Sequence, residues 1–288
     1  MAVSKDRSVT LCRILLGLQL RRLREARGLK AAAVAQRFGW STARMTRLET
    51  KDTAVEVGDV RLLCDLYEAS RELRDELENY ALITKTQKGW WETKPFKETV
   101  PAWFMACLGL EAAATEIRIY QSEFVPGLVQ DPGYAKAILG LSDADDQTIE
   151  RHAEVRSKRQ SILTRQDFAP NVTVILNEAV IRRPVGGAGI MRQQLHRILD
   201  LAERPNITVQ ILPFSAGAHP AMNGPFTIWG FDDDTVGDLA FLENLVDGGV
   251  VTNAELVGPF IGAFGQLERL AATEGDSVTA IRAAAAVL

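Results

Sequence analysis

Residues 38–50 read FGWSTARMTRLET, and they decide how the first part of the chain folds. The run AAAVAQRF that leads into this stretch consists of strong helix formers, and Gly39 follows where the end of a helix favours a left-handed residue. Ser41 can cap a second helix by accepting a hydrogen bond from a backbone amide in its first turn. Met45 and Leu48 then recur at the spacing of a buried helical stripe. The stretch therefore predicts a helix, a tight glycine-containing turn and a second, short helix.

The segments on either side of this pair predict further helices. Leu16, Leu20 and Leu23 recur at helical spacing, with arginines between them, until Gly28 ends the pattern. Another helix with apolar residues at helical spacing begins near Gly58. Two short helices joined by a glycine-containing turn and braced on both sides form the helix-turn-helix arrangement, whose second helix lies in the major groove of DNA. We therefore expect the second helix of the pair to be a DNA-recognition element.

With Met45 and Leu48 turned inward, the other side chains of the short helix face solvent. Arginine can form a bidentate contact with guanine or pair with phosphate, threonine offers a hydroxyl or a methyl group, and a helix N-terminus attracts phosphate. A solvated face on a structural helical hairpin is the alternative interpretation, because charged helix faces are common. The residues predicted to bind DNA are Lys30, Ser41, Thr42, Ala43, Arg44, Thr46 and Arg47.

The charge of the chain is divided unevenly. Residues 1–70 carry 13 Lys and Arg against 8 Asp and Glu, whereas the remaining residues carry 20 against 29. The net charge of −4 therefore hides a basic N-terminal part, which suits contact with a polyanion. The few, widely spaced cysteines predict reduced thiols, and no stretch reaches the roughly 18 apolar residues that a membrane helix needs. We expect a cytoplasmic protein without membrane contact that associates with the nucleoid when it is bound to DNA.

A helical connector is expected between two domains. The run SRELRDELENYALITKTQ places Leu73, Leu77 and Tyr80 on one helical face. Trp90 and Trp91 follow this run. Adjacent indoles usually anchor two elements together, and the alternative is a pocket for a partner or a ligand. The residues predicted to bind a partner or a ligand are Trp90, Trp91, Trp103 and His219.

The remaining residues alternate between strand and helix patterns. Strands are expected at Glu116–Tyr120, Val172–Leu176, Ile207–Leu212, Phe226–Phe231 and Leu239–Glu243. Helices are expected at Ala102–Ala114, Pro132–Leu139, Ala144–Thr164 and Ile190–Leu201, with two more capped by Asn253 and Asp276. The expected fold is an N-terminal all-α helix-turn-helix domain (about five helices) followed by an α/β or α+β domain with a small mixed sheet. The predicted domains are 1–70 for the helix-turn-helix, 71–95 for the connector and 96–288 for the regulatory, dimerisation and partner-binding part.

The C-terminal part lacks the residue patterns of catalysis. None of His152, His196 and His219 has a second histidine or a cysteine at the spacing of metal ligands, and no serine lies in a nucleophile elbow. The basic run RHAEVRSKRQ at 151–160 is interpreted as a solvated helix face or a source of salt bridges across an interface, rather than as a second nucleic-acid surface. We expect no enzyme activity, no catalytic residue, no metal and no cofactor.

Several segments carry a resemblance to known regulators. VAQRFGWSTARMTRLET resembles the recognition segment of the Cro/repressor-type (xenobiotic-response-element, XRE) helix-turn-helix regulators. GWWETKPFKETVPAWFMACLGLEAAATEIRIYQSEFVPGLVQDPGYA, NEAVIRRPVGG and other segments in order look like the C-terminal domain of a large actinobacterial regulator family related to WhiJ. The resemblance implies a transcriptional regulator, often encoded beside a small partner protein of the BldB-like or antitoxin-like type. The positions that match the recognition pattern are Ala35, Gly39, Ser41, Thr46, Arg47, Leu48 and Glu49.

Two features depart from that pattern. Such domains usually place a glutamine near the start of their second helix, where it bonds a phosphate, and here Ala31 holds that place. The loop after the short helix is commonly glycine-containing and basic, whereas here it includes Asp52, and an acidic group near phosphates weakens DNA binding. DNA binding is therefore expected to be weak or to depend on dimerisation and a partner.

Three hypotheses follow from the sequence. The leading one is a homodimeric, sequence-specific transcriptional repressor whose acidic C-terminal domain dimerises and binds a small regulatory protein. The second is an interaction protein whose degenerate helix-turn-helix sequesters a partner instead of binding DNA. The third is a regulator that senses a small molecule, which requires a defined apolar pocket in the C-terminal domain.

Overall fold

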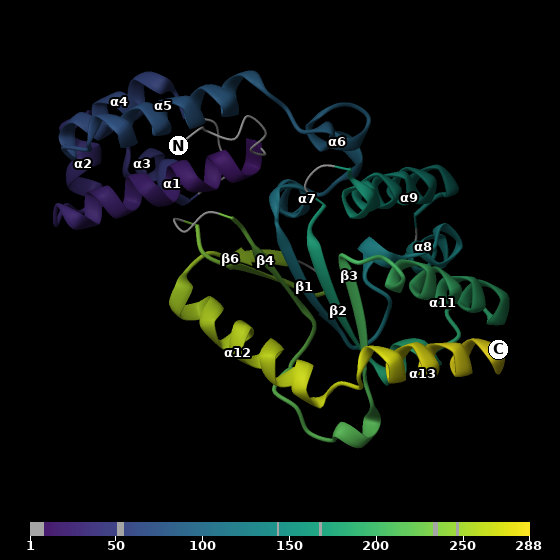
Figure 1. Cartoon of the computed structure of the whole chain (residues 1–288). Coiled ribbons are helices and arrows are strands. Elements are labelled where there is room, and N and C mark those ends of the chain that lie inside the picture. Colours follow the sequence, from purple (N-terminus) through teal and green to yellow (C-terminus); the bar gives the residue numbers. More distant parts are fainter. Residues whose placement is uncertain (1–8, 51–54, 143, 167–168, 233–235, 246–247) are drawn as a thin grey trace. The chain divides into compact units, whose positions relative to one another are not determined.

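A computed structural model of the chain divides into two units, Met1–Thr93 and Lys94–Leu288 (Figure 1). The structure describes residues 9–50, 55–142, 144–166, 169–232, 236–245 and 248–288, without the side chains at 50, 102 and 103. In these residues no helix combines the length and the apolar character that crossing a membrane requires.

The described part of the N-terminal unit consists of helices. The amphipathic α1 buries Leu15, Leu16 and Leu20 and packs against α3, α4 and α5. The expected all-α helix-turn-helix fold is confirmed. The helices are α1 (Val9–Ala26), α2 (Ala31–Arg37), α3 (Thr42–Thr50), α4 (Val57–Leu66) and α5 (Arg71–Thr86), followed by a 3-10 turn η1 (Trp90–Glu92).

Helix α5 belongs to the N-terminal unit. It was expected to join the domains, but its buried face, with Leu77, Tyr80 and Ala81, packs against α1 and α4. The division between the two units falls within the predicted connector 71–95, after Thr93. The apolar stripe of α5 is therefore part of the core of the helical unit.

The C-terminal unit is built around a mixed sheet, which has six strands in the part that the structure describes. The strand order is β3-β2-β1-β4-β5-β6, with β1, β2 and β3 parallel and the remaining neighbours antiparallel. Helices α8 and α9 connect β1 to β2, and α10 and α11 connect β2 to β3, because parallel neighbours need crossover connections. The strands are β1 (Glu116–Gln121), β2 (Asn171–Asn177), β3 (Ile207–Leu212), β4 (Phe226–Gly230), β5 (Leu239–Glu243) and β6 (Gly248–Val251).

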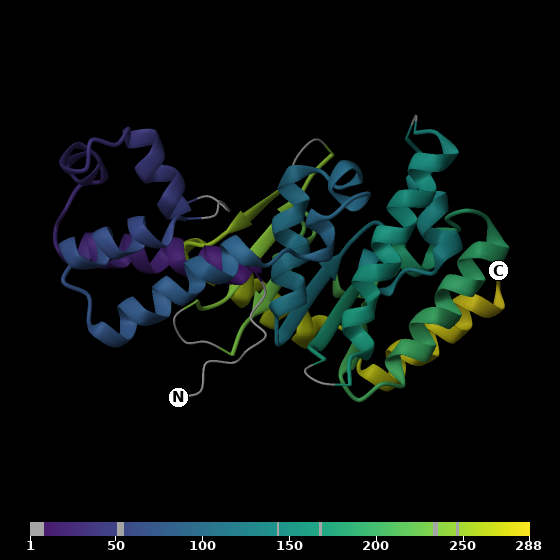
Figure 2. The same ribbon diagram turned by 90° about the horizontal axis from the view of Figure 1, so that it is seen from above.

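Helices cover both faces of this sheet (Figures 1 and 2). On one face, Tyr120 and Ile175 pack with Phe264 and Leu267 of α12 in a buried cluster. On the other face lie α7, α8 and α9, toward which Ile119 points because successive side chains of a strand alternate between faces. The helices are α6 (Phe96–Thr99), α7 (Ala102–Ala113), α8 (Pro132–Leu139), α9 (Asp146–Gln160), α10 (Glu178–Arg182), α11 (Ala188–Ala202), α12 (Ala254–Leu270) and α13 (Glu274–Ala286), with 3-10 turns η2 (Gly127–Val129), η3 (Ser161–Thr164) and η4 (Phe214–Ala216).

Two local predictions in this unit were incomplete or wrong. The edge strand β6 was not expected, because its sequence GGVV contains two glycines, which are poor strand formers, and pairing with β5 stabilises it. Asp276 was expected to cap the last helix, but it lies inside α13, and its amide donates to the hydroxyl of Thr273 at 3.2 Å. The prediction that Asn253 caps α12 is confirmed, since its side chain accepts from the amide of Glu255.

Candidate nucleic-acid interface and C-terminal cavity

Backbone hydrogen bonds fix the corner between α2 and α3. The amide of Trp40 donates to the carbonyl of Ala35 at 2.8 Å, and a second bond from the amide of Gly39 completes a Schellman motif. Gly39 has a φ of +66°, which glycine adopts without a steric penalty. The hydroxyl of Ser41 accepts from the amide of Arg44 at 3.1 Å, which confirms the predicted cap. The direction of α3 is therefore set by its first residues.

Buried contacts hold α3 against α1. The guanidinium of Arg24 donates to both carboxylate oxygens of Glu49, at 2.6 and 2.8 Å, and both side chains are buried. Gly17 allows the two helices to approach closely, because an added Cβ would lie 2.9 Å from the carbonyl oxygen of Glu49. Met45 of α3 is fully buried. These contacts fix which side of α3 remains exposed.

The exposed side of α3 carries most of the residues predicted to bind DNA. Within the described residues, Arg47 has no hydrogen-bonding or ion-pairing partner, so its guanidinium is free to bind a phosphate or a base edge. Thr46 instead donates its hydroxyl to the carbonyl of Thr42 at 3.0 Å, within the helix. The exposed residues of the predicted set are Ser41, Thr42, Ala43, Thr46 and Arg47 at α3 and Lys30 before α2.

Arg44 is placed differently from Arg47. Its guanidinium lies 2.6 Å from the carboxylate of Asp59 and 4.4 Å from the centroid of the Trp40 ring. The contact with Asp59 satisfies part of its charge within the protein. Arg44 must therefore give up this ion pair before it can bind a phosphate.

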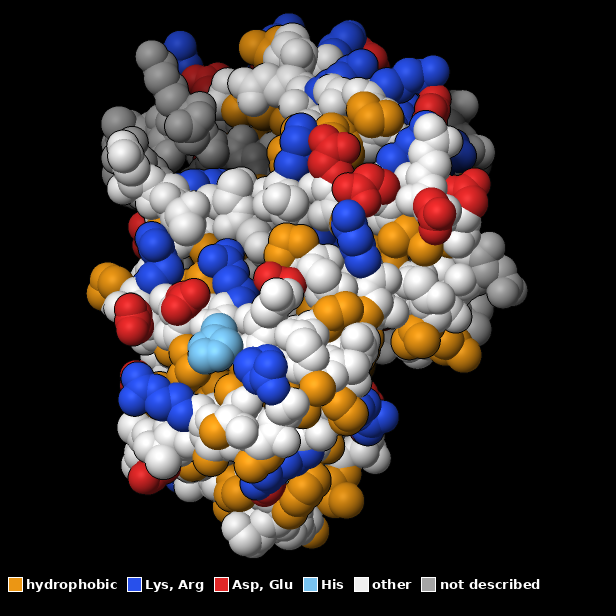
Figure 3. Space-filling model, turned by 90° about the vertical axis from the view of Figure 1, so that its right-hand side faces the viewer, with side chains coloured by type: hydrophobic (Ala, Val, Ile, Leu, Met, Phe, Trp, Pro, Cys, Tyr) orange, Lys and Arg blue, Asp and Glu red, His pale blue; other side chains and the backbone are white. Residues whose placement is uncertain are grey.

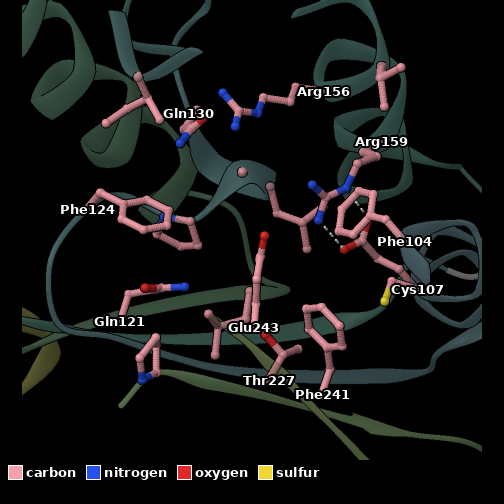
Figure 4. A pocket seen from close by; sticks show the side chains of 18 of the residues that line it. Phe104, Cys107, Gln121, Phe124, Gln130, Arg156, Arg159, Thr227, Phe241 and Glu243 are labelled. Atoms are coloured by element: carbon pink, nitrogen blue, oxygen red, sulfur yellow. Dashed lines mark hydrogen bonds and ion pairs between the residues drawn. The ribbon is translucent and has the colours of Figure 1, made fainter. Parts of the chain in front are cut away.

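The C-terminal unit contains a partly open cavity between its sheet and α7, α8 and α9. The cavity has a volume of about 350 Å³, within the range of sites for small molecules. Figure 4 shows Phe104, Phe124 and Phe241 around it. Apolar side chains from strands and helices form most of the remaining wall, so the cavity offers an apolar body good contact. The aromatic residues that line the cavity are Phe104, Phe124, Phe226, Trp229 and Phe241.

Charged groups enter this apolar cavity from both layers. On the helical side, Arg159 donates to both carboxylate oxygens of Glu111, at 2.9 and 2.8 Å. Arg156, one turn earlier in α9, donates to the carbonyl of Ala135 at 3.0 Å, and burial lowers its pKa to about 10. On the sheet side, Glu243 points into the cavity (Figure 4), and the loss of surrounding water raises its pKa.

Comparison with protein families assigns both units. A family model described as a helix-turn-helix domain matches residues 15–77, which include α2, the turn and α3. A second model, described as a domain of unknown function (DUF5753), matches residues 104–283, well over half of the chain. The chain belongs to the DUF5753 family. Neither a curated protein nor a solved structure matches it.

The residues predicted to bind a partner or a ligand are divided between the two units, with Trp90 and Trp91 in the first and Trp103 and His219 in the second. Trp90 and Trp91 precede the DUF5753 domain and meet edge to face, with ring centroids 5.6 Å apart, and Trp91 is buried. His219 lies within the DUF5753 domain, where its ring centroid is 5.6 Å from that of Tyr120 and burial lowers its pKa. Trp103 was also predicted to bind a partner or a ligand, but its side chain is outside the part that the structure describes.

The polar groups of the DUF5753 cavity were not predicted from the sequence. The run at 151–160 was interpreted as a solvated face or a source of interface salt bridges, but Arg156 and Arg159 line the cavity. The available signal was the spacing of His152, Val155, Arg156 and Arg159, which places all four on one side of a helix.

On the face of the molecule in Figure 3, the basic side chains lie among acidic and apolar side chains. Of the described residues, no group of three or more His, Cys, Asp or Glu could hold a metal ion.

Proposed function

We propose that the chain is a sequence-specific DNA-binding transcriptional regulator, acting as a repressor, in which α3 reads the major groove. The helix-turn-helix match to residues 15–77 supports the DNA-binding class. The observation that carries the proposal is the unpartnered side chain of Arg47 among the described residues, on a helix that Arg24 and Glu49 hold in place. A rigid helix with an exposed arginine and small polar neighbours suits direct contact with base edges.

The test of DNA binding is a titration followed by fluorescence anisotropy. The full chain is added to duplexes tiled across the region upstream of its own coding sequence, at about 50 mM and about 200 mM salt. We expect one tile to bind more tightly than the others, with an affinity that falls steeply at the higher salt. Equal binding to every tile would show that the chain binds DNA without sequence specificity. No binding to any tile at the lower salt concentration would overturn the proposal.

We further propose that the DUF5753 domain forms the homodimer and binds a small BldB-like or antitoxin-like protein encoded nearby. This part of the proposal comes from the resemblance to the actinobacterial WhiJ-related regulators. The sign of regulation is tested with a reporter under the control of the bound tile, with and without the chain, and a repressor lowers the signal. Analytical ultracentrifugation of the chain, alone and mixed with the neighbouring small protein, tests the dimer and the complex. A monomer that does not bind the small protein would contradict both assignments.

An interaction protein with a degenerate helix-turn-helix is the second candidate. The ion pair between Arg44 and Asp59, and the alanine at position 31, favour it, because both reduce the contacts available to phosphates. The two candidates differ in one result. Replacing Arg44 and Arg47 with alanine should relieve repression in cells if the chain acts on DNA, whereas a sequestering protein keeps its activity.

The proposal assigns the chain no enzymatic reaction and no cofactor. Its place of action would be the cytoplasm, at the nucleoid when it is bound to its operator. A regulator that senses a small molecule is the third candidate, and the cavity of the DUF5753 domain is the observation that favours it.

A further inference from the structure

The cavity of the C-terminal unit contains an arginine that forms no ion pair with any of the described residues. Arg156 lines the cavity and bonds a backbone carbonyl, and no carboxylate of the described residues lies within ion-pairing distance of its guanidinium. Arg159, on the same helix, is neutralised by Glu111 through two hydrogen bonds. Surrounding a charge with protein without a counterion is costly. The contrast between the two arginines indicates that Arg156 has room for an anion from outside the chain.

An acidic group faces the same cavity from the opposite layer. Glu243, at the end of β5, points in from the sheet and is also without an ion-pairing partner in the described part of the chain. The positive charges of Arg156 and Arg159 oppose the effect of burial on its pKa but do not cancel it. Within the described residues, the cavity thus presents a cation, Arg156, and an acid, Glu243, that form no ion pair. A simple anion would satisfy the first and be repelled by the second, whereas a molecule with both charges satisfies the two together.

Two glutamine side chains, Gln121 and Gln130, contribute amide oxygens that accept no hydrogen bond within the described residues. Gln130 is 1% exposed, and its amide nitrogen donates to the carbonyl of Val125 at 2.7 Å, which fixes the orientation of the amide group. Its oxygen has no hydrogen-bonding partner within the described residues, and the same holds for the buried oxygen of Gln121. Both side chains line the cavity (Figure 4). Buried acceptors of this kind are satisfied by a donor on a ligand or by water.

From these observations we infer that the cavity binds a small amino carboxylate with an apolar side chain. The carboxylate pairs with Arg156, the amino group lies toward Glu243 and donates to the glutamine oxygens, and the side chain packs against the aromatic wall. The apolar and aromatic amino acids belong to this class. The inference concerns the C-terminal unit and does not depend on whether α3 binds DNA.

The test is isothermal titration calorimetry of the full chain with matched compounds at millimolar concentration. L-phenylalanine, L-leucine and L-tryptophan carry both charged groups, phenylpropanoate lacks the amino group, and phenethylamine lacks the carboxylate. We expect at least one of the amino acids to bind, and the two incomplete analogues to bind at least about tenfold more weakly, because each leaves one charged group of the cavity unpaired. Binding of an incomplete analogue as tight as that of phenylalanine, or no binding of any amino acid, would overturn the inference.

Variants of the two charged residues test the assignment of each end. Arg156→Gln and Glu243→Gln should each weaken binding of the amino acid by about tenfold or more. Arg151→Gln and Glu154→Gln, which change exposed residues of α9, are the matched controls and should bind like the wild type. Tighter binding by Glu243→Gln would exclude the amino group as its partner. If a variant does not fold, as judged by circular dichroism, the compound series on the wild type decides the question alone.

Discussion

Two residues, Gly39 and Ser41, determine where α2 ends and α3 begins. Gly39 takes the left-handed conformation that ends α2, and the hydroxyl of Ser41 accepts one of the amides that α3 leaves unpaired in its first turn. Both roles depend on local chemistry. Glycine has no Cβ and therefore adopts a positive φ without a clash, and serine has a short side chain whose hydroxyl can accept a hydrogen bond from a nearby amide. That is why this corner could be predicted from thirteen letters of sequence, without knowledge of the rest of the molecule.

Replacing Gly39 with alanine tests this corner. The left-handed conformation costs an L-residue roughly 1–2 kcal/mol, so Gly39→Ala should destabilise the N-terminal unit by about 1 kcal/mol. Gly58→Ala is the control, because Gly58 does not have a positive φ and a Cβ added there would meet no other group within 4 Å. It should be neutral or slightly stabilising. Urea unfolding followed by circular dichroism measures both, and equal stabilities would contradict the assigned role of Gly39.

At the scale of elements, the buried pair of Arg24 and Glu49 joins α1 to α3. Breaking such a pair leaves an uncompensated charge, so Glu49→Gln should destabilise the attachment of α3 by about 3 kcal/mol. Glu78→Gln removes the same kind of two-bond contact with Arg61, whose side chain is 60% exposed, and should therefore cost much less stability.

Native-state hydrogen exchange of the α3 amides measures this difference. Faster exchange in Glu49→Gln, with little change in Glu78→Gln, is the expected result, because exchange reports the free energy of local opening. If the α3 amides exchange equally in the two variants, the buried pair does not hold the helix.

The secondary structure was largely predictable because helix and strand periods are local properties of the sequence. The expected bounds of α8, β3 and β5 agree with the structure at every residue, and the mixed sheet is confirmed. The cavity could not be predicted in this way. Its lining comes from α7, α8, α9, three strands and the loops between them. Which arginine of α9 meets an acid depends on where α7 places Glu111. The edge strand β6 was not predicted for a similar reason. Its two glycines have a low strand propensity, and the strand is stabilised by pairing with β5, which is distant information for a local pattern.

At the scale of the whole molecule, the charge in the cavity makes stability depend on pH. The pKa of Glu243 in the folded chain is raised above the ordinary value of 4.5, so above that pH the folded state binds more protons than the unfolded state. Its contribution to stability is therefore complete below the ordinary value and is lost as the pH rises through the raised one.

Glu243→Gln should remove this loss, since glutamine does not titrate. The variant should gain stability relative to the wild type as the pH rises from 4.5 toward neutral, measured as the thermal midpoint at each pH. Leu242→Gln, at the exposed neighbouring position, is the control and should shift the midpoint by the same amount at every pH. A constant difference between Glu243→Gln and the wild type would show that the carboxyl group does not titrate abnormally.

The central claim is that the exposed side of α3 recognises DNA, and the most direct measurement replaces Arg47. A duplex is selected from random sequences by the wild-type chain, and its affinity for the wild type, Arg47→Ala and Arg71→Ala is measured by anisotropy over a range of salt concentrations. Arg71 is an exposed arginine of α5, outside the α2–α3 pair. The account predicts that Arg47→Ala weakens binding by about tenfold or more while Arg71→Ala has little effect. Unchanged affinity of Arg47→Ala, or the failure of the wild type to select any sequence, would contradict it.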